Sequence, residues 1–299
     1  MPPGRPVVAY GAAMKLGIFA FPTDQSLGVV PLAREVEERG WHSLWLPDHS
    51  HIPTSRKTPP GGMKTDRPLL DEYKRNVDIF CALSAAAAVT ERIELGTGVC
   101  LVAQRDPFWT AKEVATVDLL SNGRVRFGIG FGWNREEMAH HGLEFRTRRA
   151  KGREHVLAMK ALWTQEEASF SGEFVSFESS WAWPKPVQDP HPPVWLGGAA
   201  VHGLLDHVVE YGDGWMPIYR DANRESVDQL HRACDAAGRD PSTVTLGVYA
   251  PFPEVAELER LAELGFAWAA LLVRPYPATD ERRKLDELQP LIDHFGPLA

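Results

Sequence analysis

Two adjacent residues of complementary acid–base character, Asp48 and His49, directly follow the apolar run Ser43–Pro47. Such a run is typical of a short buried strand, so the pair stands where that strand ends. A carboxylate beside an imidazole can fix the tautomer of the ring and favour its protonated form, which gives a proton donor near neutral pH. A hydrogen-bonded structural pair explains the same residues equally well. His49 is therefore a candidate catalytic residue, with Asp48 beside it.

A second candidate feature is a run of glycines at every second position, Gly128, Gly130 and Gly132, which continues into Trp133 and Asn134. Glycine weakens the interior of a strand, so three at this spacing need a reason. The usual reason is that something flat or bulky approaches the backbone closely. A strand end that clears space and then supplies an aromatic ring and an amide is typical of the floor of a ligand pocket.

A third candidate feature is the glycine pair that opens the segment Gly197–Gly203, between an apolar run and a helical pattern. Free backbone N–H groups and the helix dipole favour a phosphate at such a turn. Tight packing explains a glycine pair there about as often, so both interpretations stay open.

Eight apolar, strand-like runs alternate with eight segments of helical period. The runs are Lys15–Phe21, Ser43–Pro47, Ile93–Val102, Val125–Phe131, Val194–Gly197, Gly214–Ile218, Val244–Ala250 and Ala269–Val273. The helical segments are Leu27–Arg39, Val77–Val89, Trp109–Leu120, Arg153–Trp163, Leu204–Tyr211, Asn223–Ala237, Val255–Leu264 and Glu281–His294. This α/β alternation over 299 residues predicts one closed (β/α)8 TIM barrel. A doubly wound sheet is the alternative, but residues 19–24 lack the glycine fingerprint common after its first strand.

Three long connections interrupt the alternation, after the second strand (His51–Asn76), after the fourth strand (Arg135–Arg149) and after the fourth helix (Ala168–Pro193). The last contains a hairpin pattern around Gly172, followed by a proline-rich strap. Active sites of TIM barrels lie on the loops that follow the strands. The two loops that follow strands are therefore expected to shape the substrate pocket.

Composition sets limits on the class of protein. Hydrophobic residues make up 44% of the chain and charged residues 24%, which permits a large core. The net charge of -8 argues against general nucleic-acid binding. No apolar run reaches the ~18 residues that would indicate a membrane span. Met1–Ala13 is rich in proline and glycine, which predicts a disordered extension ahead of a barrel domain over residues 14–299, and not a secretory signal.

Three scattered cysteines, Cys81, Cys100 and Cys234, indicate buried thiols of a cytoplasmic protein more than a disulfide framework. A basic cluster contains Arg146, Arg148, Arg149, Lys151 and Arg153. It fits a solvated helix start, or a surface that meets the anionic tail of a ligand.

A metal centre is a different possibility. His49 and His51 have the i, i+2 spacing that puts two imidazoles on one side of a strand, as in metal-dependent barrel hydrolases. The ends of the later strands lack the further ligands that such hydrolases need, and the adjacent His140 and His141 would point apart on a helix. We therefore expect no metal site.

Six motifs occur in an order that resembles a known family. They are Trp45–His49, Leu95–Val99, Gly128–Asn134, Pro184–Gln188, Pro193–Gly198 and Tyr211–Trp215. The chain is similar over about 14–297 to the luciferase-like flavin and deazaflavin oxidoreductases, and within them to the branch that uses the deazaflavin coenzyme F420. The resemblance implies a (β/α)8 barrel, a bound flavin or deazaflavin, a small-molecule substrate and a homodimer.

The resemblance also implies roles for individual residues. In the family's deazaflavin dehydrogenases, the aspartate equivalent to Asp48 contacts the cofactor and the histidine equivalent to His49 lies beside the reacting ring carbon. The turn after the fifth strand holds the cofactor phosphate, here Gly197, Gly198, Ala199, Val201 and His202. The third strand ends in a bulge, often with a non-proline cis peptide, behind the ring, here Thr97, Gly98, Val99 and Cys100. The fourth strand contributes Gly130, Phe131, Gly132, Trp133 and Asn134.

Two positions depart from those dehydrogenases, which carry a tryptophan where this chain has Pro53 and a glutamate where it has Trp133. The departures argue against oxidation of a sugar or an alcohol and leave cofactor binding intact. Arg274 could face an anionic ligand or form a surface salt bridge.

Three functions follow as hypotheses: an F420-dependent oxidoreductase that transfers a hydride to or from a small organic substrate, an FMN-dependent monooxygenase, or a non-catalytic flavin-binding barrel. Asp48 favours F420, because a carboxylate is less welcome beside a flavin ring that ionises to an anion.

Overall fold

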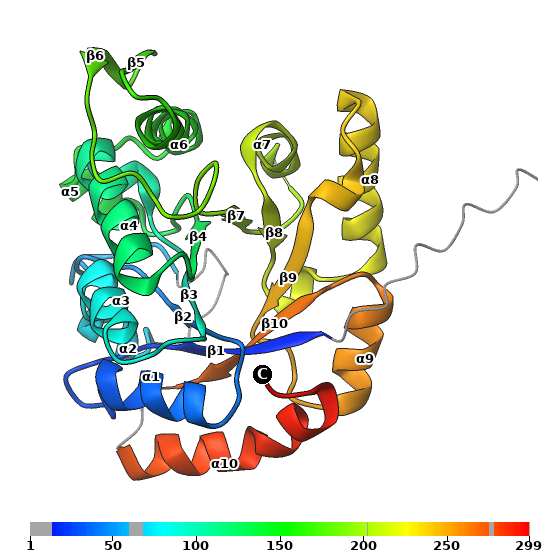
Figure 1. Cartoon of the computed structure of the whole chain (residues 1–299). Helices are drawn as coiled ribbons and strands as arrows, with labels where there is room; N and C mark the ends of the chain where they lie inside the picture. Colours follow the sequence, from blue (N-terminus) through cyan, green and yellow to red (C-terminus); the bar gives the residue numbers. More distant parts are fainter. Residues whose placement is uncertain (1–13, 60–67, 202, 275–277, 299) are drawn as a thin grey trace, which may run out of the picture.

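Eight parallel strands close into a barrel in the order β1-β10-β9-β8-β7-β4-β3-β2 (Figure 1). The computed structural model describes residues 14–59, 68–201, 203–274 and 278–298, so the predicted extension over residues 1–13 lies outside the described chain. The barrel strands are β1 (Lys15–Ala20), β2 (Ser43–Leu46), β3 (Glu94–Thr97), β4 (Val125–Ile129), β7 (Val194–Gly197), β8 (Gly214–Met216), β9 (Thr245–Tyr249) and β10 (Trp268–Val273). The predicted TIM barrel is confirmed.

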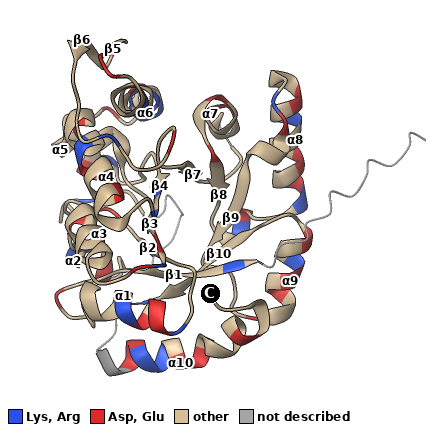
Figure 2. Ribbon diagram, in the orientation of Figure 1, with Lys and Arg blue, Asp and Glu red and all other residues tan. Residues whose placement is uncertain are grey.

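Helices cover the outside of the barrel. They are α1 (Val29–Glu38), α3 (Ile79–Ala87), α4 (Pro107–Ser121), α6 (Arg148–Thr164), α7 (Leu204–Tyr211), α8 (Arg224–Ala237), α9 (Val255–Glu263) and α10 (Ala278–Phe295). The long connections add the short helices α2 (Glu72–Arg75) and α5 (Arg135–His140), and single 3-10 turns lie at η2 (Val102–Gln104), η3 (Tyr219–Asp221) and η4 (Pro241–Thr243). Helix α6 begins at Arg148, five residues before its predicted start, because the arginines there extend the helix beyond its apolar period. Charged residues of both signs lie along α1, α8 and α10 (Figure 2).

The barrel interior is filled by large aromatic side chains that pack against glycines. Trp45 and Trp195 are fully buried there, with ring centroids 5.6 Å apart. A Cβ at Gly96 would lie 2.1 Å from Trp45, and a Cβ at Gly214 would lie 2.6 Å from Trp195. Alternation of large and small side chains fills a small barrel without a pore. Glycine is therefore required on the strands that face the two indoles.

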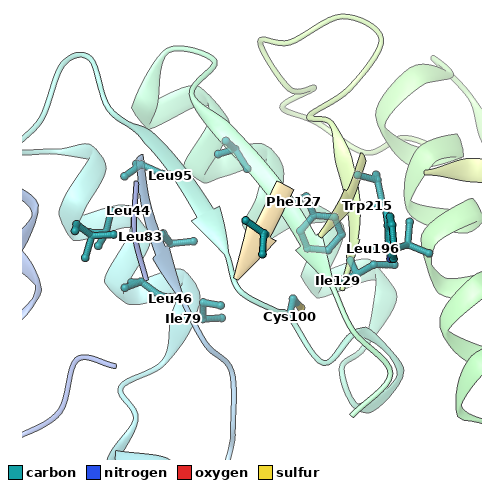
Figure 3. Packing of buried hydrophobic residues seen from close by; sticks show 14 of the residues in the cluster. Leu44, Leu46, Ile79, Leu83, Leu95, Cys100, Phe127, Ile129, Leu196 and Trp215 are labelled. Carbon is teal, nitrogen blue, oxygen red and sulfur yellow. The ribbon is translucent and has the colours of Figure 1, made fainter. Parts of the chain in front are cut away.

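A second apolar layer lies between the strands and the helices. Leu44 and Leu46 flank Trp45 on β2 and point the opposite way, because successive side chains alternate across a strand. They pack with Ile79 and Leu83 of α3, and all four are at most 1% exposed (Figure 3). Strands that are buried on both faces read as continuous apolar runs, which is why the sequence revealed them.

The end of β3 approaches β4 unusually closely. The pairing advances from Gly96 opposite Arg126 to Cys100 opposite Ile129, so β3 carries one extra residue in a bulge. A Cβ at Gly128 would lie 2.0 Å from the Thr97 carbonyl oxygen. The bulge includes a cis peptide between Gly98 and Val99, the feature that the resemblance implied.

The bulge refines one inference from sequence. A Cβ at Gly130 would lie 2.3 Å from Val99 Cγ2, and a Cβ at Gly132 would lie 2.5 Å from Met138 Cε. The glycines therefore make room for protein atoms of neighbouring segments, and they also line the cavity at this end of the barrel.

The insertion before β7 forms the predicted hairpin and strap. Strands β5 (Ala168–Ser171) and β6 (Ser176–Ser180) pair antiparallel beside α6, away from the barrel (Figure 1). The strap then returns along α4, where the buried Asp118 carboxylate accepts hydrogen bonds from the backbone N–H groups of Val187 (2.7 Å) and Gln188 (3.0 Å). A single buried carboxylate thus anchors a segment that has no regular structure of its own.

The three cysteines are free; Cys100 and Cys234 are buried as expected, whereas Cys81 is exposed on the outer side of α3. Among the described residues, no helix combines the length and apolar character that crossing a membrane requires.

The close approach at Gly130 makes a testable prediction. Gly130→Ala forces its new Cβ against Val99, so we expect the free energy of unfolding to fall by about 1–3 kcal/mol. In a Val99→Ala background the obstructing methyl groups are absent, and most of that loss should disappear. Urea unfolding of the single and double variants measures the coupling. A Val125→Ala background, at the far end of β4 from Gly130, should leave the full loss; an equal loss in all three backgrounds would contradict the assignment.

Candidate active site

A cavity of ≈ 420 Å³ opens at the carboxyl ends of the barrel strands. Its lining comes from the barrel strands β1, β7, β8 and β9, from the segments that follow β2, β3 and β4, and from the starts of α6 and α7. The lining residues include Phe19, Phe21, Pro47, Asp48, His49, Tyr73, Gly98, Val99, Leu101, Gly130, Phe131, Gly132, Trp133, Arg148, Arg149, Gly197, Gly198, Ala199, Val201, Leu204, Met216, Ile218, Arg220, Asp221 and Tyr249. Its volume lies in the range that binds cofactors and small ligands.

Most of the residues that the sequence nominated line this cavity. They are Asp48, His49, Gly98, Val99, Gly130, Phe131, Gly132, Trp133, Gly197, Gly198, Ala199 and Val201. Three others lie in its supporting shell instead. Thr97 Oγ1 donates to the Gly128 carbonyl (2.6 Å), Cys100 is fully buried, and Asn134 Oδ1 accepts from the Glu137 N–H (3.4 Å). His202 lies outside the described residues.

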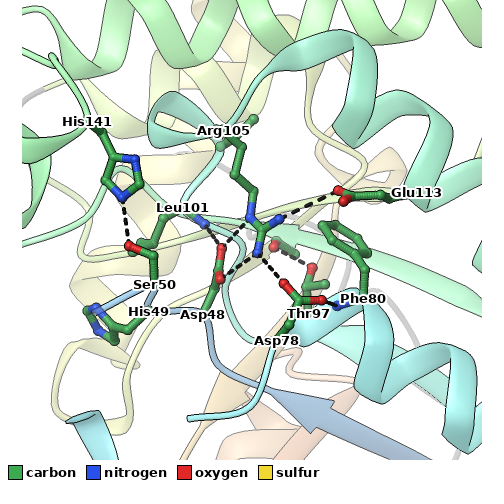
Figure 4. A network of polar contacts seen from close by, with 12 residues as sticks. Asp48, His49, Ser50, Asp78, Phe80, Thr97, Leu101, Arg105, Glu113 and His141 are labelled. Carbon is green, nitrogen blue, oxygen red and sulfur yellow. Dashed lines mark hydrogen bonds and ion pairs between the residues drawn. The ribbon is translucent and has the colours of Figure 1, made fainter. Parts of the chain in front are cut away.

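Asp48 is held by Arg105, a partner that the sequence did not indicate (Figure 4). Arg105 Nε and Nη2 donate to the two carboxylate oxygens at 2.8 Å each, and the Leu101 N–H donates to Oδ2 at 3.0 Å. Burial disfavours the charge of Arg105, but the hydrogen bonds to Asp48 and the negative charges nearby outweigh it and raise the pKa of the guanidinium well above its usual range. The bidentate pair ties the end of β2 to the loop after β3.

His49 takes its carboxylate partner from α5 and not from its neighbour in sequence. Its Nδ1 lies 2.8 Å from Glu137 Oε2, and the side chains are only 6% and 1% exposed. Glu137 Oε1 also accepts from the Ser50 N–H at 3.2 Å. Because Glu137 occupies Nδ1, the ring nitrogen that can exchange a proton with a ligand is Nε2. The sequence placed Glu137 in the long connection after the fourth strand, but nothing in its local pattern indicated this contact.

Aromatic rings enclose His49 on two sides. Tyr73 and Trp133 each lie edge-on to the imidazole, with centroids 5.6 Å away. Tyr73 comes from α2 in the loop after β2, and Trp133 follows the glycines of β4. The loop after β2 and the segment after β4 thus meet around His49.

The basic cluster divides into two groups. Arg146 and Arg153 form exposed ion pairs with Glu144 and Glu210. Arg148 and Arg149 line the cavity at the start of α6. Burial, followed by the charges of Arg149 and Arg135, lowers the pKa of Arg148. The solvated helix start therefore fits Arg146 and Arg153, and contact of Arg148 and Arg149 with an anionic ligand stays a prediction.

A third guanidinium, from Arg220 after β8, lines the same cavity and lies beside Asp221. The wall formed by Phe19, Val99 and Tyr249 is apolar by contrast. A ligand with a flat ring and an anionic tail matches this division. The turn after β7 also lines the cavity, and its Gly198 has φ 137°, a conformation that favours glycine.

Arg274 forms a salt bridge, the second of the two roles expected for it. Its guanidinium donates to the buried carboxylate of Glu72 in α2. The pair fastens the loop after β2 to the end of β10.

Residues 14–286 match the family described as luciferase-like monooxygenase. The chain belongs to this family. It is 44% identical over 258 residues to an uncharacterized protein of Mycobacterium tuberculosis, which covers 84% of this chain and 89% of the relative. Its relatives include both deazaflavin-dependent and flavin-dependent enzymes, so membership makes the chain a luciferase-like oxidoreductase without fixing the coenzyme.

Two relatives represent those two groups. An F420-dependent hydroxymycolic acid dehydrogenase of M. tuberculosis is 25% identical over 278 residues, 91% of this chain and 71% of the relative. An FMNH(2)-dependent dimethylsulfone monooxygenase of Pseudomonas putida is 34% identical over 133 residues, 44% of this chain and 36% of the relative. The crystal structure of monooxygenase RslO1 from Streptomyces bottropensis has the same fold, with a TM-score of 0.75 at 22% identity, over 95% of this chain and 100% of that one.

The Asp48–Arg105 pair makes a second prediction. Asp48→Asn leaves a largely shielded guanidinium, 21% exposed, with a weaker partner, so we expect the free energy of unfolding to fall by roughly 3 kcal/mol. Glu113→Gln is the control, because Glu113 lies 3.5 Å from the same guanidinium and is 35% exposed; its removal should change stability by less than about 1 kcal/mol. Guanidinium chloride unfolding measures both. Equal stabilities for the Asp48 variant and the wild type would show that the pair does not anchor the loop.

Proposed function

We propose that the protein is an F420-dependent oxidoreductase that transfers a hydride between the deazaflavin and a small organic substrate. The observation that carries the proposal is the position of His49: Glu137 fixes it at the wall of a cavity whose lining combines apolar side chains with three arginines. The similarity to an F420-dependent dehydrogenase covers 91% of this chain and supports the coenzyme, since the similarity to the FMNH(2)-dependent enzyme covers less than half of this chain.

The lining fits the proposed coenzyme in shape and charge. Val99, at the bulge of β3, and the Gly130–Phe131 segment provide a surface for a flat ring. Arg148, Arg149 and Arg220 provide positive charge for an anionic tail, and the Gly198 turn provides a backbone surface beside it. Bound here, the coenzyme would donate or accept the hydride.

The protein's own contribution is orientation and proton transfer. His49 Nε2 would give a proton to the substrate, or take one from it, as the hydride moves. Glu137 acts through His49 as a positioning residue, because its hydrogen bond fixes the tautomer and direction of the ring. Tyr73 and Trp133 exclude water around the imidazole.

An FMN-dependent monooxygenase is the second candidate function. The matched part of the FMNH(2)-dependent relative has the higher identity, 34% against 25%. Arg105 also neutralises Asp48, which weakens the argument that its carboxylate disfavours a flavin anion.

Coenzyme titration separates the two functions. We expect the apo-protein to bind F420 more tightly than FMN. Quenching of the coenzyme or tryptophan fluorescence measures the binding of each. Arg148→Gln should weaken F420 binding about 10-fold or more, because it removes a charged donor from the cavity. Arg146→Gln is the matched control: it lies two residues away, is 84% exposed and should bind like the wild type. Micromolar FMN binding without detectable F420 binding would favour the monooxygenase.

Variants of His49 test the catalytic role. His49→Asn should slow single-turnover hydride transfer by about 10²–10⁴-fold with little change in the F420 dissociation constant. Glu137→Gln should slow transfer less and change its pH profile, because a neutral amide holds the imidazole differently. If His49→Asn transfers hydride at the wild-type rate but unfolds earlier, His49 is structural. If the protein is a non-catalytic coenzyme-binding barrel, it transfers no hydride, and the His49 and Glu137 variants change only its stability.

The proposed enzyme is expected to act as a homodimer. Large apolar side chains are exposed on α4 and the adjoining strap, including Trp109 at 70%, Trp181 at 74% and Trp183 at 58%. Such a patch is typical of a protein interface. Sedimentation should give twice the chain mass of 33.3 kDa, and the pair of changes Trp109→Glu and Trp181→Glu should give the monomer. A wild-type monomer at tens of micromolar would contradict this.

A further inference from the structure

A cluster of histidines lies where the loop after β2 meets α5, behind His49. His51 comes from the loop, His140 is the last residue of α5, and His141 caps that helix. Because the helix ends at His140, both of these rings reach His51, with centroids 5.1 and 5.7 Å from it. The expectation that His140 and His141 would point apart is therefore wrong.

Two imidazole nitrogens of this cluster face a single hydroxyl. Ser50 Oγ lies 2.6 Å from His141 Nε2 (Figure 4) and 2.9 Å from His51 Nδ1. The buried Glu137 carboxylate lies on the same side, and its Oε1 accepts from the Ser50 N–H. Ligand atoms of His51, Glu137 and His141 all lie within 4.8 Å of one another. Two imidazoles and a carboxylate are a ligand set that zinc uses.

Neighbouring groups hold the rings and the carboxylate as the outer shell of a metal site does. His51 Nε2 lies 2.8 Å from His140 Nδ1, so His140 can accept the second N–H of His51 and direct Nδ1 toward Ser50. His49 Nδ1 lies 2.8 Å from Glu137 Oε2 and orients that carboxylate. Ligating histidines and carboxylates characteristically have such partners.

Space for an ion and its water adjoins the cluster. A second cavity of ≈ 340 Å³ is lined by Ser50, Glu137, His141, Asn76 and Gln104. The amide nitrogen and oxygen of Gln104 are buried there and have no hydrogen-bond partner within the described chain. Unsatisfied polar atoms around a cavity indicate that it receives a polar occupant.

We propose that His51, Glu137 and His141 form a site for a divalent transition-metal ion such as Zn²⁺, with water from the second cavity as its fourth ligand. Zinc–ligand bonds of about 2.0–2.2 Å place ligand atoms roughly 3.3–3.6 Å apart, so the three groups converge by small side-chain rotations. Nitrogen donors favour zinc, cobalt or nickel over magnesium and calcium. The ion would join the loop after β2 to α5 through residues that do not face the main cavity, except that Glu137 also contacts His49.

Isothermal titration with ZnCl₂ tests the site on the whole chain, stripped with EDTA, free of any affinity tag and without coenzyme. We expect one ion per chain. His51→Ala and His141→Ala should each weaken binding at least about 100-fold, and His140→Ala about 10–100-fold as an outer-shell change. His294→Ala is the matched control, because His294 is an exposed histidine on α10 that pairs with Glu259 and should leave binding unchanged.

Cobalt provides a second readout that does not depend on activity. Co²⁺ bound to the wild type should give the intense visible absorption of a four-coordinate ion, which Zn²⁺ should abolish. Circular dichroism establishes that each variant is folded, and His141→Asn replaces any alanine variant that is not. No binding at millimolar Zn²⁺, or equal binding by the wild type and the His51 and His141 variants, would overturn the proposal whatever the coenzyme proves to be.

Discussion

The close approach of the β3 end to β4 is the constraint on which the site depends. Only glycine at positions 128 and 130 lets the Thr97 carbonyl and the Val99 side chain come so near the neighbouring strand. The resulting bulge presents Val99 to the cavity and turns the Leu101 N–H toward Asp48. The cavity floor and the anchoring of the loop after β2 thus both depend on the absence of side chains at Gly128 and Gly130.

Paired charges from distant segments then fix the loops around that floor. Asp48 binds Arg105, 57 residues away, and His49 contacts Glu137, 88 residues away. The His49–Glu137 contact is buried and the Asp48–Arg105 contact is partly buried, and loss of one partner from such a pair costs stability. Asp48 and His49 are adjacent in sequence but have different partners. Asp48 fixes the loop after β3 through Arg105, and Glu137 holds His49 at the wall of the cavity.

The barrel could be predicted because strands buried on both faces produce apolar runs at regular spacing. Most cavity residues could be named because they follow those runs. The partners Arg105 and Glu137 could not, since long-range pairing leaves no trace in local periodicity. The glycines of β4 were correctly singled out for a close approach, but sequence could not show that Val99 and Thr97 make it. The cluster of His51 and His141 was likewise hidden, because a helix boundary decides where the second ring points.

We propose that the coenzyme ring lies between the Val99 floor and the His49 imidazole. A crystal structure of the protein with F420 tests this position most directly. We expect ring density in contact with Val99, with His49 Nε2 facing the reacting edge and the tail directed toward Arg148 and Arg220. Ring density outside this cavity, or a His49 side chain separated from the ring by other residues, would contradict it.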